Sequence, residues 1–411
     1  MHRKSLTLAT TVTLAFGVIF LAACSGGGAN PPARFQAHDI ADFPGYSVAV
    51  ADFNNDGRLD VIANSLGASD VAWYENPTWE RHVIIEGVSS VVNQAMADIN
   101  GDGIPEIAYQ SGFAMVAANS MGFNTIAMSQ GDPTMPWTTQ QIDAFPTSHH
   151  VAWADLDGDG ELELINALLI GEESVGPAYD QDQSSFFWYG QGDWKRGTVD
   201  DEIPGIIHRV RPVKWDPGSR DQLLVASFEG IALYRAIGMG DAMTFEKELI
   251  SSGHDSEPAP RLGASDVGMG ASGSGRIVAS VEPWHGNEVV VYTEQDGTWQ
   301  RRVLFSDIGS GHEIAVLDLN GDGYADIVAN DQSRMTTRNP DGTPGVHVFF
   351  SPEDPATGEW IYRRIETESA MNGCVGGDMN EDGRPDLICT GGGGKIIWYE
   401  NLGNEEAETD M

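Results

Sequence analysis

Five short acidic loops are the most chemically informative feature of this sequence. Each follows the pattern Asp-x-Asn/Asp-x-Asp-Gly-x-x-Asp/Glu, with oxygen-bearing side chains at positions 1, 3, 5 and 9 and glycine at position 6. Ca²⁺ takes six to eight oxygen ligands, and glycine permits the sharp turn that folds such ligands inward. The pattern therefore predicts up to five bound Ca²⁺ ions.

The predicted calcium ligands form five groups of four. They are Asp52, Asn54, Asp56 and Asp60; Asp98, Asn100, Asp102 and Glu106; Asp155, Asp157, Asp159 and Glu163; Asp318, Asn320, Asp322 and Asp326; and Asp378, Asn380, Asp382 and Asp386. Each loop is shorter than an EF-hand loop, and β-prone residues such as Val61-Ile62-Ala63 follow it in place of a helix.

Histidines form a second set of candidate functional residues. His149, His150, His208 and His312 each lie just before an expected strand, and His285 lies in the segment Glu-Pro-Trp-His-Gly-Asn. Imidazole titrates near neutrality and can act as acid, base or metal ligand. One histidine at a strand end is usually a packing residue, so the hypothesis of a site depends on whether these five converge.

Two kinds of chemistry fit such a cluster. Imidazoles that converge with a carboxylate such as Glu313 would suit Zn²⁺ or another transition metal. Tyrosine and arginine beside a histidine would suit abstraction of a proton next to a carbonyl, with arginine stabilising the developing charge. Arg211, which lies in a local positive patch with Arg209 and Lys214, is therefore added to the five histidines as a candidate catalytic residue.

The acidic loops also mark the longer repeat that must position these residues. Each loop is followed by a β-rich run, an aromatic strand and a further strand opened by Trp or another large residue, as in residues 71–76 and 79–84. Two degenerate repeats, near residues 213–227 and 270–280, fill the gap between the third and fourth loops. Seven repeats of four short strands predict an all-β, seven-bladed propeller, with no metal in blades four and five.

The ends of the chain fit a closed ring. The last repeat stops after three strands, and residues 34–40 resemble the missing fourth strand, so the propeller is predicted to span residues 34–401 with an acidic tail at 402–411. Cys374 and Cys389 flank the last loop and would lie opposite each other in a hairpin. An exported protein could join them in a disulfide, or they could remain two buried thiols.

The loops, spacing and strand pattern resemble the FG-GAP/VCBS repeat family of integrin-α-like propellers. That resemblance implies that the loops join the first and second strands of each blade and hold Ca²⁺ on one face. The histidines would then gather on the opposite face, around the central channel. The histidines and the segment 282–287 also look similar to the propeller of aldos-2-ulose dehydratase-like proteins, which implies elimination of water from keto-sugars with a bound metal.

The N-terminus predicts export. Arg3 and Lys4 precede an apolar stretch that ends in Leu21-Ala-Ala-Cys24, which resembles a bacterial lipobox; an ordinary cleaved signal with a chance cysteine is the alternative. Residues 1–24 would be the signal peptide and 25–33 a Gly-rich tether, with the protein lipid-anchored at Cys24, in the outer membrane of a Gram-negative bacterium. The formal net charge of −38 argues against a nucleic-acid partner.

Three functions fit these features. The first is a calcium-stabilised, surface-tethered propeller that binds a ligand, most plausibly carbohydrate, on its channel face. The second is a sugar dehydratase or polysaccharide lyase that uses the histidine cluster. The third is a protein–protein adhesion or assembly module, since propellers often serve that role.

Overall fold

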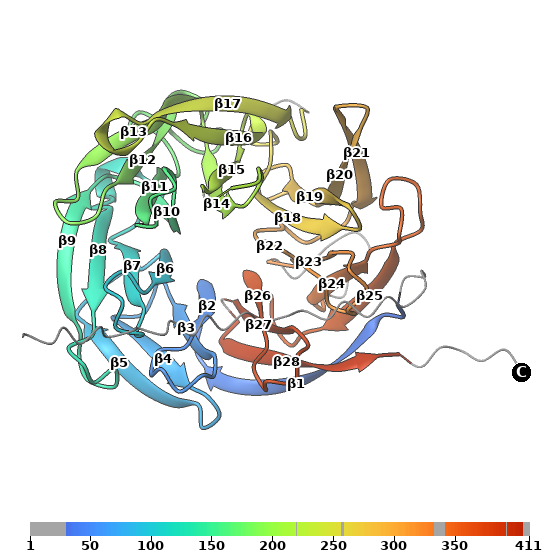
Figure 1. Ribbon diagram of the computed structural model, residues 1–411, viewed down its shortest axis with the longest axis horizontal. Helices are drawn as coiled ribbons and strands as arrows, with labels where there is room; N and C mark the ends of the chain where they lie inside the picture. The colour runs from blue at the N-terminus through green and yellow to red at the C-terminus, as the bar shows by residue number, and fades with distance from the viewer. Residues whose placement is uncertain (1–29, 219, 256–258, 333–341, 392, 406–411) are drawn as a thin grey trace, which may run out of the picture.

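The computed structural model describes residues 30–218, 220–255, 259–332, 342–391 and 393–405. These residues form seven four-stranded antiparallel sheets arranged as blades around a central axis (Figure 1), which confirms the predicted seven-bladed propeller. The described propeller runs from Ala33 to Asn404, slightly beyond the predicted boundaries of 34 and 401.

The innermost strand of each blade faces the channel. In ring order these strands are β2 (Ser47–Ala51), β6 (Asn93–Ala97), β10 (Ser148–Ala154), β14 (Ile207–Val213), β18 (Asp266–Ser272), β22 (Ile314–Leu317) and β26 (Gly373–Gly377). The second strands are β3 (Asp60–Asn64), β7 (Glu106–Ser111), β11 (Glu163–Leu168), β15 (Gln222–Ser227), β19 (Gly275–Glu282), β23 (Asp326–Asn330) and β27 (Asp386–Gly391).

The outer half of each blade contains its third and fourth strands. The third strands are β4 (Asp70–Glu75), β8 (Phe123–Met128), β12 (Gln183–Tyr189), β16 (Gly230–Ile237), β20 (Glu288–Gln295), β24 (Gly345–Phe350) and β28 (Lys395–Asn404). The fourth strands are β5 (Glu80–Glu86), β9 (Thr138–Ala144), β13 (Arg196–Pro204), β17 (Thr244–Ser251), β21 (Thr298–Phe305), β25 (Ile361–Glu366) and β1 (Ala33–Asp42). Two short 3₁₀ helices, η1 (Ala117–Asn119) and η2 (Gly240–Ala242), lie between strands.

The burial of each strand follows its place in the blade. The second strand β3 is buried along its whole length, whereas the outer strand β5 begins with exposed polar residues. The core lies between neighbouring blades: Ile62 and Trp73 of blade one pack with Ile107 of blade two. Apolar side chains on both faces of the middle strands are thus needed to bury each blade against its two neighbours.

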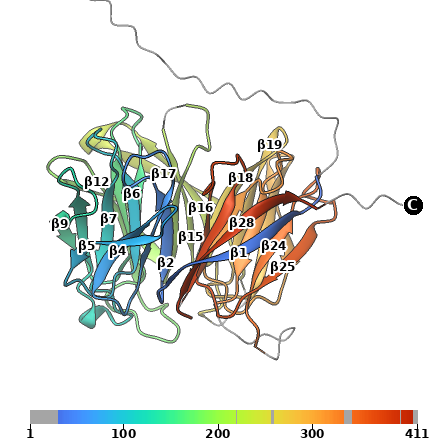
Figure 2. The same ribbon diagram turned by 90° about the horizontal axis from the view of Figure 1, so that it is seen from below.

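The ring is closed by its two chain ends. Strand β1 pairs antiparallel with β28, with His38 opposite Trp398, so the first strand completes the seventh blade as the sequence predicted. Figure 2 shows the two strands running side by side across the outside of the molecule. This pairing gives blade seven its fourth strand and covers the edge of β28.

Cys374 and Cys389 are directly opposed on β26 and β27 and form a disulfide, with Cα atoms 4.1 Å apart. Of the two pairing states left open by the sequence, the structure therefore has the bonded one. The lipobox and residues 25–29 of the predicted tether lie outside the described residues. The last four residues of that prediction were wrongly assigned: the backbone N–H of Asn30 donates to Asp322 at 3.1 Å, and Ala33 begins β1. Within the described ranges, η1 and η2 are each only three residues long, and neither could cross a membrane.

Candidate active site on the channel face

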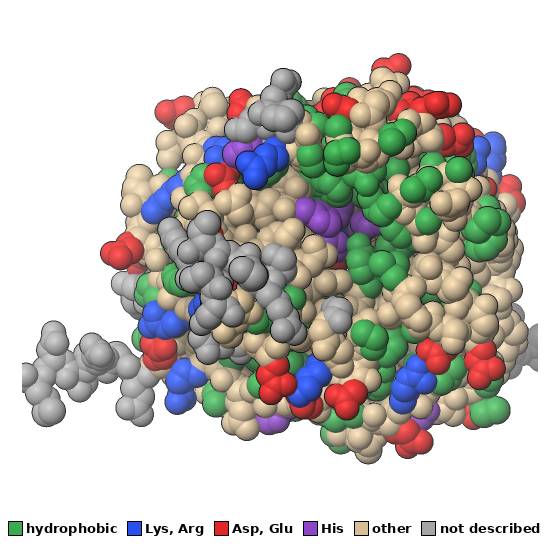
Figure 3. Space-filling model, turned by 180° about the vertical axis from the view of Figure 1, so that it is seen from behind, with side chains coloured by type: hydrophobic (Ala, Val, Ile, Leu, Met, Phe, Trp, Pro, Cys, Tyr) green, Lys and Arg blue, Asp and Glu red, His purple; other side chains and the backbone are tan. Residues whose placement is uncertain are grey.

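The acidic loops and the histidines lie at opposite ends of the innermost strands. All five acidic loops join a first strand to a second strand, as β2 joins β3 through residues 52–59. The candidate histidines lie at the starts of innermost strands or in the loop between β19 and β20. Figure 3 shows histidine side chains at the bottom of a central hollow on one face.

Four of the five predicted histidines converge. The ring centroid of His208 lies 5.1 Å from that of His149, 5.1 Å from that of His285 and 4.8 Å from that of His312. One ring nitrogen from each of His208, His285 and His312 falls in a group whose members all lie within 4.8 Å of one another. Segments from blades three, four, five and six therefore meet at one point.

Two of these histidines are aimed by local irregularities in the strands. In β10 the pairing steps from Ser148 to His150 while the partner strand advances one residue, so His149 is the extra residue of a β-bulge. His208 has the same place at the start of β14. A bulge re-aims a side chain that regular pairing would direct elsewhere. Neither bulge could be predicted from the residue pattern alone.

Tyr46, the residue just before β2, completes the cluster. Its hydroxyl oxygen lies 3.2 Å from Nε2 of His312 and 3.4 Å from Nε2 of His149. Burial is the main cause that raises the pKa of Tyr46, with the Glu313 carboxylate adding to the effect. The phenol therefore stays protonated at neutral pH and can donate a hydrogen bond.

The imidazoles are held neutral. Burial, reinforced by the positive charge of Arg209, lowers the pKa of His149 to about 3, and burial lowers the pKa of His285 to about 4. The pKa values of His208 and His312 also lie well below the usual range, mainly because of burial. Neutral imidazole is the form that binds metal ions or accepts a proton.

The hydrogen-bond partner of His208 fixes its orientation. Its Nδ1 lies 2.6 Å from the carbonyl oxygen of Ser265 and must donate there, because a carbonyl oxygen only accepts. The lone pair of Nε2 therefore faces the cluster, where it lies 3.2 Å from Nε2 of His285. This is the arrangement of a metal-ligating histidine oriented by a backbone carbonyl.

His150 and Arg211, the remaining candidate catalytic residues, lie outside the cluster. Nε2 of His150 accepts a hydrogen bond from Arg209 at 2.8 Å, so that ring nitrogen is already occupied. Arg211 lies one alternation further along β14, where its NH2 is 3.2 Å from Asp266 and its Nε donates to the Val267 carbonyl. Successive side chains of a strand point to opposite faces, so Arg209 and Arg211 lie on one face of β14 and His208 lies on the other.

Arg209, Asp266 and Glu313 form a buried group of charged side chains next to the cluster, called here the charged layer. The guanidinium of Arg209 lies 2.8 Å from Glu313 and 3.1 Å from Asp266 and donates to His150, so it links blades three to six. Burial raises the pKa of Glu313, and Arg209 acts in the opposite direction. The sequence marked Arg209 only as part of a positive patch and did not single out Asp266.

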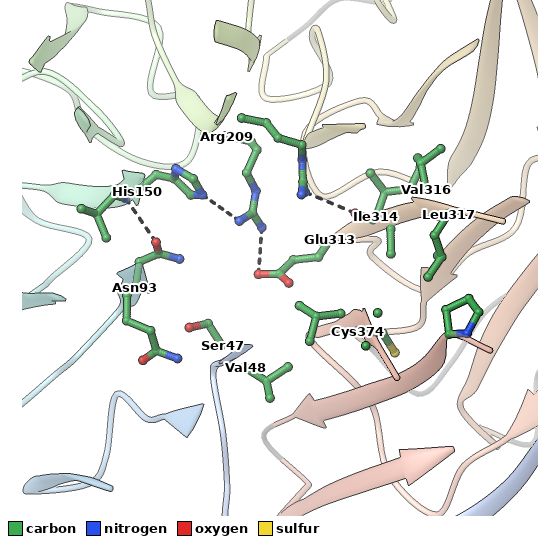
Figure 4. Close-up of a pocket in the computed structure, with 18 residues that line it drawn as sticks. Ser47, Val48, Asn93, His150, Arg209, Glu313, Ile314, Val316, Leu317 and Cys374 are labelled. Carbon is green, nitrogen blue, oxygen red and sulfur yellow. Dashed lines mark hydrogen bonds and ion pairs between the residues drawn. The ribbon is translucent and has the colours of Figure 1, made fainter. Parts of the chain in front are cut away.

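A cavity of about 460 Å³ lies along the channel beside this layer. His150, Arg209 and Glu313 line one part of it, and Leu317 and Pro385 line another. Figure 4 shows the dashed contacts that join His150, Arg209 and Glu313 across the channel. His208, His285 and Tyr46 do not line this cavity.

The hollow has an aromatic wall. The ring centroid of Trp284 lies 4.5 Å from that of His285, and that of Phe113 lies 5.3 Å from that of His149. Tyr179, from the long loop between β11 and β12, packs edge-on against Trp284 at 5.8 Å. Figure 3 shows apolar surface around one side of the hollow. Aromatic rings beside polar groups suit the apolar faces of sugars.

The acidic loops fold their side-chain oxygens inward. In blade one the backbone N–H of Gly57 donates to Asp52 at 2.8 Å, and that of Arg58 donates to Asp56 at 2.9 Å; blades two, six and seven repeat both contacts. In blade three, one oxygen from each of Asp155, Asp157 and Asp159 lies within 4.8 Å of the others. These oxygen sets fit a hard cation.

The carboxylate at loop position 9 also has a structural role. In blade one, Asp60 is fully buried and accepts backbone N–H groups from Phe53 and Asn76, which ties the loop to the end of the third strand. Asp326 and Asp386 repeat this pair of contacts. Burial raises the pKa of Asp60 to about 6 and that of Asp326 to about 8.

Comparison with known families agrees with the β-propeller fold described above. Residues 52–109 match the FG-GAP-like repeat family and residues 310–343 match the FG-GAP repeat family. The chain is thus a β-propeller with similarity to FG-GAP repeat proteins.

A more particular similarity covers the middle of the chain. Residues 125–295, which include four of the five candidate histidines, match the β-propeller domain family of aldos-2-ulose dehydratase. Aldos-2-ulose dehydratase of Phanerodontia chrysosporium is 25% identical over 198 residues, covering 42% of this chain and 19% of that protein. The chain therefore matches about a fifth of the length of that relative.

Two solved structures are similar to this chain at low sequence identity. BBS1N, in a complex with ARL6DN, has a TM-score of 0.53 at 10% identity and covers 92% of this chain and 99% of its own. A luciferin-regenerating enzyme has a TM-score of 0.46 at 11% identity and covers 90% and 96%. The first of these likenesses supports the fold alone.

Proposed function

We propose that this protein is a metal-dependent lyase that eliminates water from a keto-sugar or a related carbohydrate at the histidine cluster. The observation that carries this proposal is the convergence of four neutral imidazoles and one phenol from five blades. Similarity to a sugar dehydratase over residues 125–295 supports the same reaction class. A cluster of this kind is more than packing requires, because each ring comes from a different segment of the chain.

His208, His285 and His312 are the proposed ligands of a transition metal such as Zn²⁺. Tetrahedral Zn–N bonds of about 2.0–2.1 Å place two ligand nitrogens about 3.3 Å apart. The Nε2 atoms of His208 and His285 are 3.2 Å apart, so they fit such an ion. A metal bound there would act as a Lewis acid on a substrate carbonyl and make the neighbouring C–H group more acidic.

His149 and Tyr46 are the proposed proton-transfer residues. Neutral His149 accepts the proton from the carbon next to the carbonyl, and the electron pair of that C–H bond forms the new C=C bond. As the C–O bond breaks and its electron pair leaves with the oxygen, Tyr46 donates its proton to the departing hydroxyl group, which leaves as water. The proton then returns from His149 to Tyr46, whose hydroxyl oxygen lies 3.4 Å from Nε2 of His149. Phe113 and Trp284 stack on the apolar face of the sugar and limit the access of bulk water.

Tyr46→Phe tests this assignment directly. We expect metal content to stay unchanged and kcat for keto-sugar dehydration to fall by about 100-fold or more, since positioned proton transfer contributes 10²–10⁴-fold. Metal content is measured by elemental analysis after dialysis, and turnover by the ultraviolet absorbance of the enone product. Equal activity in both proteins would contradict the role of Tyr46. A wild-type protein that binds sugars but holds only Ca²⁺ and turns nothing over would favour the binding function.

We also propose that the five acidic loops hold structural Ca²⁺. Chelation with EGTA should lower Tm by about 5 °C or more, because a site at 100 times its Kd contributes about 2.7 kcal/mol of stability. Calcium, but not magnesium, should restore Tm in a thermal scan. An unchanged Tm after chelation would argue against structural calcium. Lipid anchoring at Cys24 remains a prediction from the sequence.

A further inference from the structure

Blade five contains a buried carboxylate that the proposed reaction does not use. Glu282 is fully buried, and its Oε1 accepts hydrogen bonds from the hydroxyls of Ser280 and Tyr292, each at 2.5 Å. Its Oε2 accepts two hydrogen bonds from Arg301, from Nε at 2.9 Å and from NH2 at 2.7 Å. A buried carboxylate with four donors is strongly held in one position.

Arg301 connects both ends of the loop that carries His285. Glu282 is the last residue of β19 and pairs with Glu288, the first residue of β20. The NH2 group of Arg301 lies 2.7 Å from Glu282 and 2.5 Å from Glu288. The guanidinium on β21 therefore holds together the end of β19 and the start of β20, which residues 283–287 connect.

The loop needs such support because its backbone is unusual. His285 has a φ angle of +47°, in the left-handed region that a side chain disfavours. Contacts from other segments hold the turn: Trp284 N–H donates to the Leu262 carbonyl at 3.1 Å, and Gly311 N–H donates to the Gly286 carbonyl at 2.7 Å. A conformation of this kind persists only where its surroundings determine it.

His285 depends on this loop more than its partners do on theirs. His208 belongs to the innermost strand β14, and His312 lies two residues before the innermost strand β22. His285 instead reaches the cluster from a loop between the second and third strands. Displacement of that loop would move one ligand nitrogen and leave the other two in place.

We propose that Glu282 and Arg301 are positioning residues that hold the His285 imidazole against His208 and His312. This inference rests on the proposed function, because its expected consequence is tight metal binding at the proposed metal centre. Groups that orient metal ligands typically contribute 10- to 100-fold to metal affinity.

Arg301→Gln, Arg301→Lys and Arg235→Gln test this role. Arg235 is a matched control, because it also bridges two carboxylates, Asp216 and Glu248, in the neighbouring blade four. We expect Co²⁺ affinity, followed by its visible spectrum in folded protein, to fall roughly 10- to 100-fold in Arg301→Gln. Arg301→Lys keeps the charge and loses the bidentate contact, so its affinity should be intermediate. Arg235→Gln should bind Co²⁺ as the wild type does.

A second measurement separates this inference from the proposed function. In metal-free protein, the His285 ring resonance, assigned with His285→Gln, should shift in Arg301→Gln and Arg301→Lys but not in Arg235→Gln. Wild-type protein that binds no Co²⁺ would overturn the metal centre while the ring resonance still tests the positioning. Folded Arg301 variants with wild-type Co²⁺ affinity and an unshifted His285 resonance would overturn the positioning role.

Discussion

Replacement of His208 by glutamine is expected to lower transition-metal affinity by at least about 100-fold and to abolish dehydration. His208 is the centre of the cluster, with the rings of His149, His285 and His312 all within 5.1 Å of its own. The loss removes a ligand outright, whereas loss of a group that merely orients a ligand already costs 10- to 100-fold. Metal titration and enone production measure the two effects.

The control for this substitution is His38→Gln. His38 pairs with Glu400 on the two outer strands of blade seven, β1 and β28, whereas the cluster lies at the channel ends of the innermost strands. It should keep wild-type metal affinity and turnover. Full metal binding in His208→Gln would rule out the proposed ligand set.

Replacement of Arg209 by methionine should lower the free energy of unfolding by about 3–5 kcal/mol, as expected when one partner of a buried ion pair is removed. The guanidinium is a partner of both Asp266 and Glu313, and Asp266 is fully buried. Without Arg209, Asp266 keeps Arg211 and two backbone N–H groups, but Glu313 loses its cation. Denaturant unfolding measures the change.

Two further variants serve as a control and as a partial rescue for this prediction. Arg235→Met removes a cation that pairs with half-exposed carboxylates, and it should change stability by about 1 kcal/mol or less. Adding Glu313→Gln to Arg209→Met should recover part of the lost stability, because the unpaired buried charge is gone. A loss below about 1 kcal/mol in Arg209→Met would show that the charged layer does not stabilise the ring.

The fold could be predicted well from the sequence because each blade repeats the same strand pattern, and five of the seven also repeat the acidic loop. The nine-residue acidic loop gave the blade spacing, and residues 34–40 identified the closing strand, which the β1–β28 pairing confirms. The loss of the acidic side chains in blades four and five did not hide their strand pattern. Local turn chemistry and strand periodicity are short-range properties, so they can be read along the chain.

The site could be predicted only in part. The gathering of His149, His208, His285 and His312 follows from blade geometry, since the starts of the first strands and the loops between the second and third strands share one face. The bulges that aim His149 and His208, and the occupied ring nitrogen of His150, depend on pairing registers that one sequence does not specify. Tyr46 and Arg209 gained their roles only from neighbours more than fifty residues away in the chain.

The pairing of β1 with β28 has a consequence for how the chain reaches its native state. Six blades are each built from consecutive strands, so they can form as the chain emerges during synthesis. The seventh must wait, because His38 meets Glu400 only after 362 further residues have been made. Contacts of such long range form slowly. Until the two strands pair, β1 and then β28 each have an unpaired edge, so newly made chains are most prone to pair with one another at these two strands.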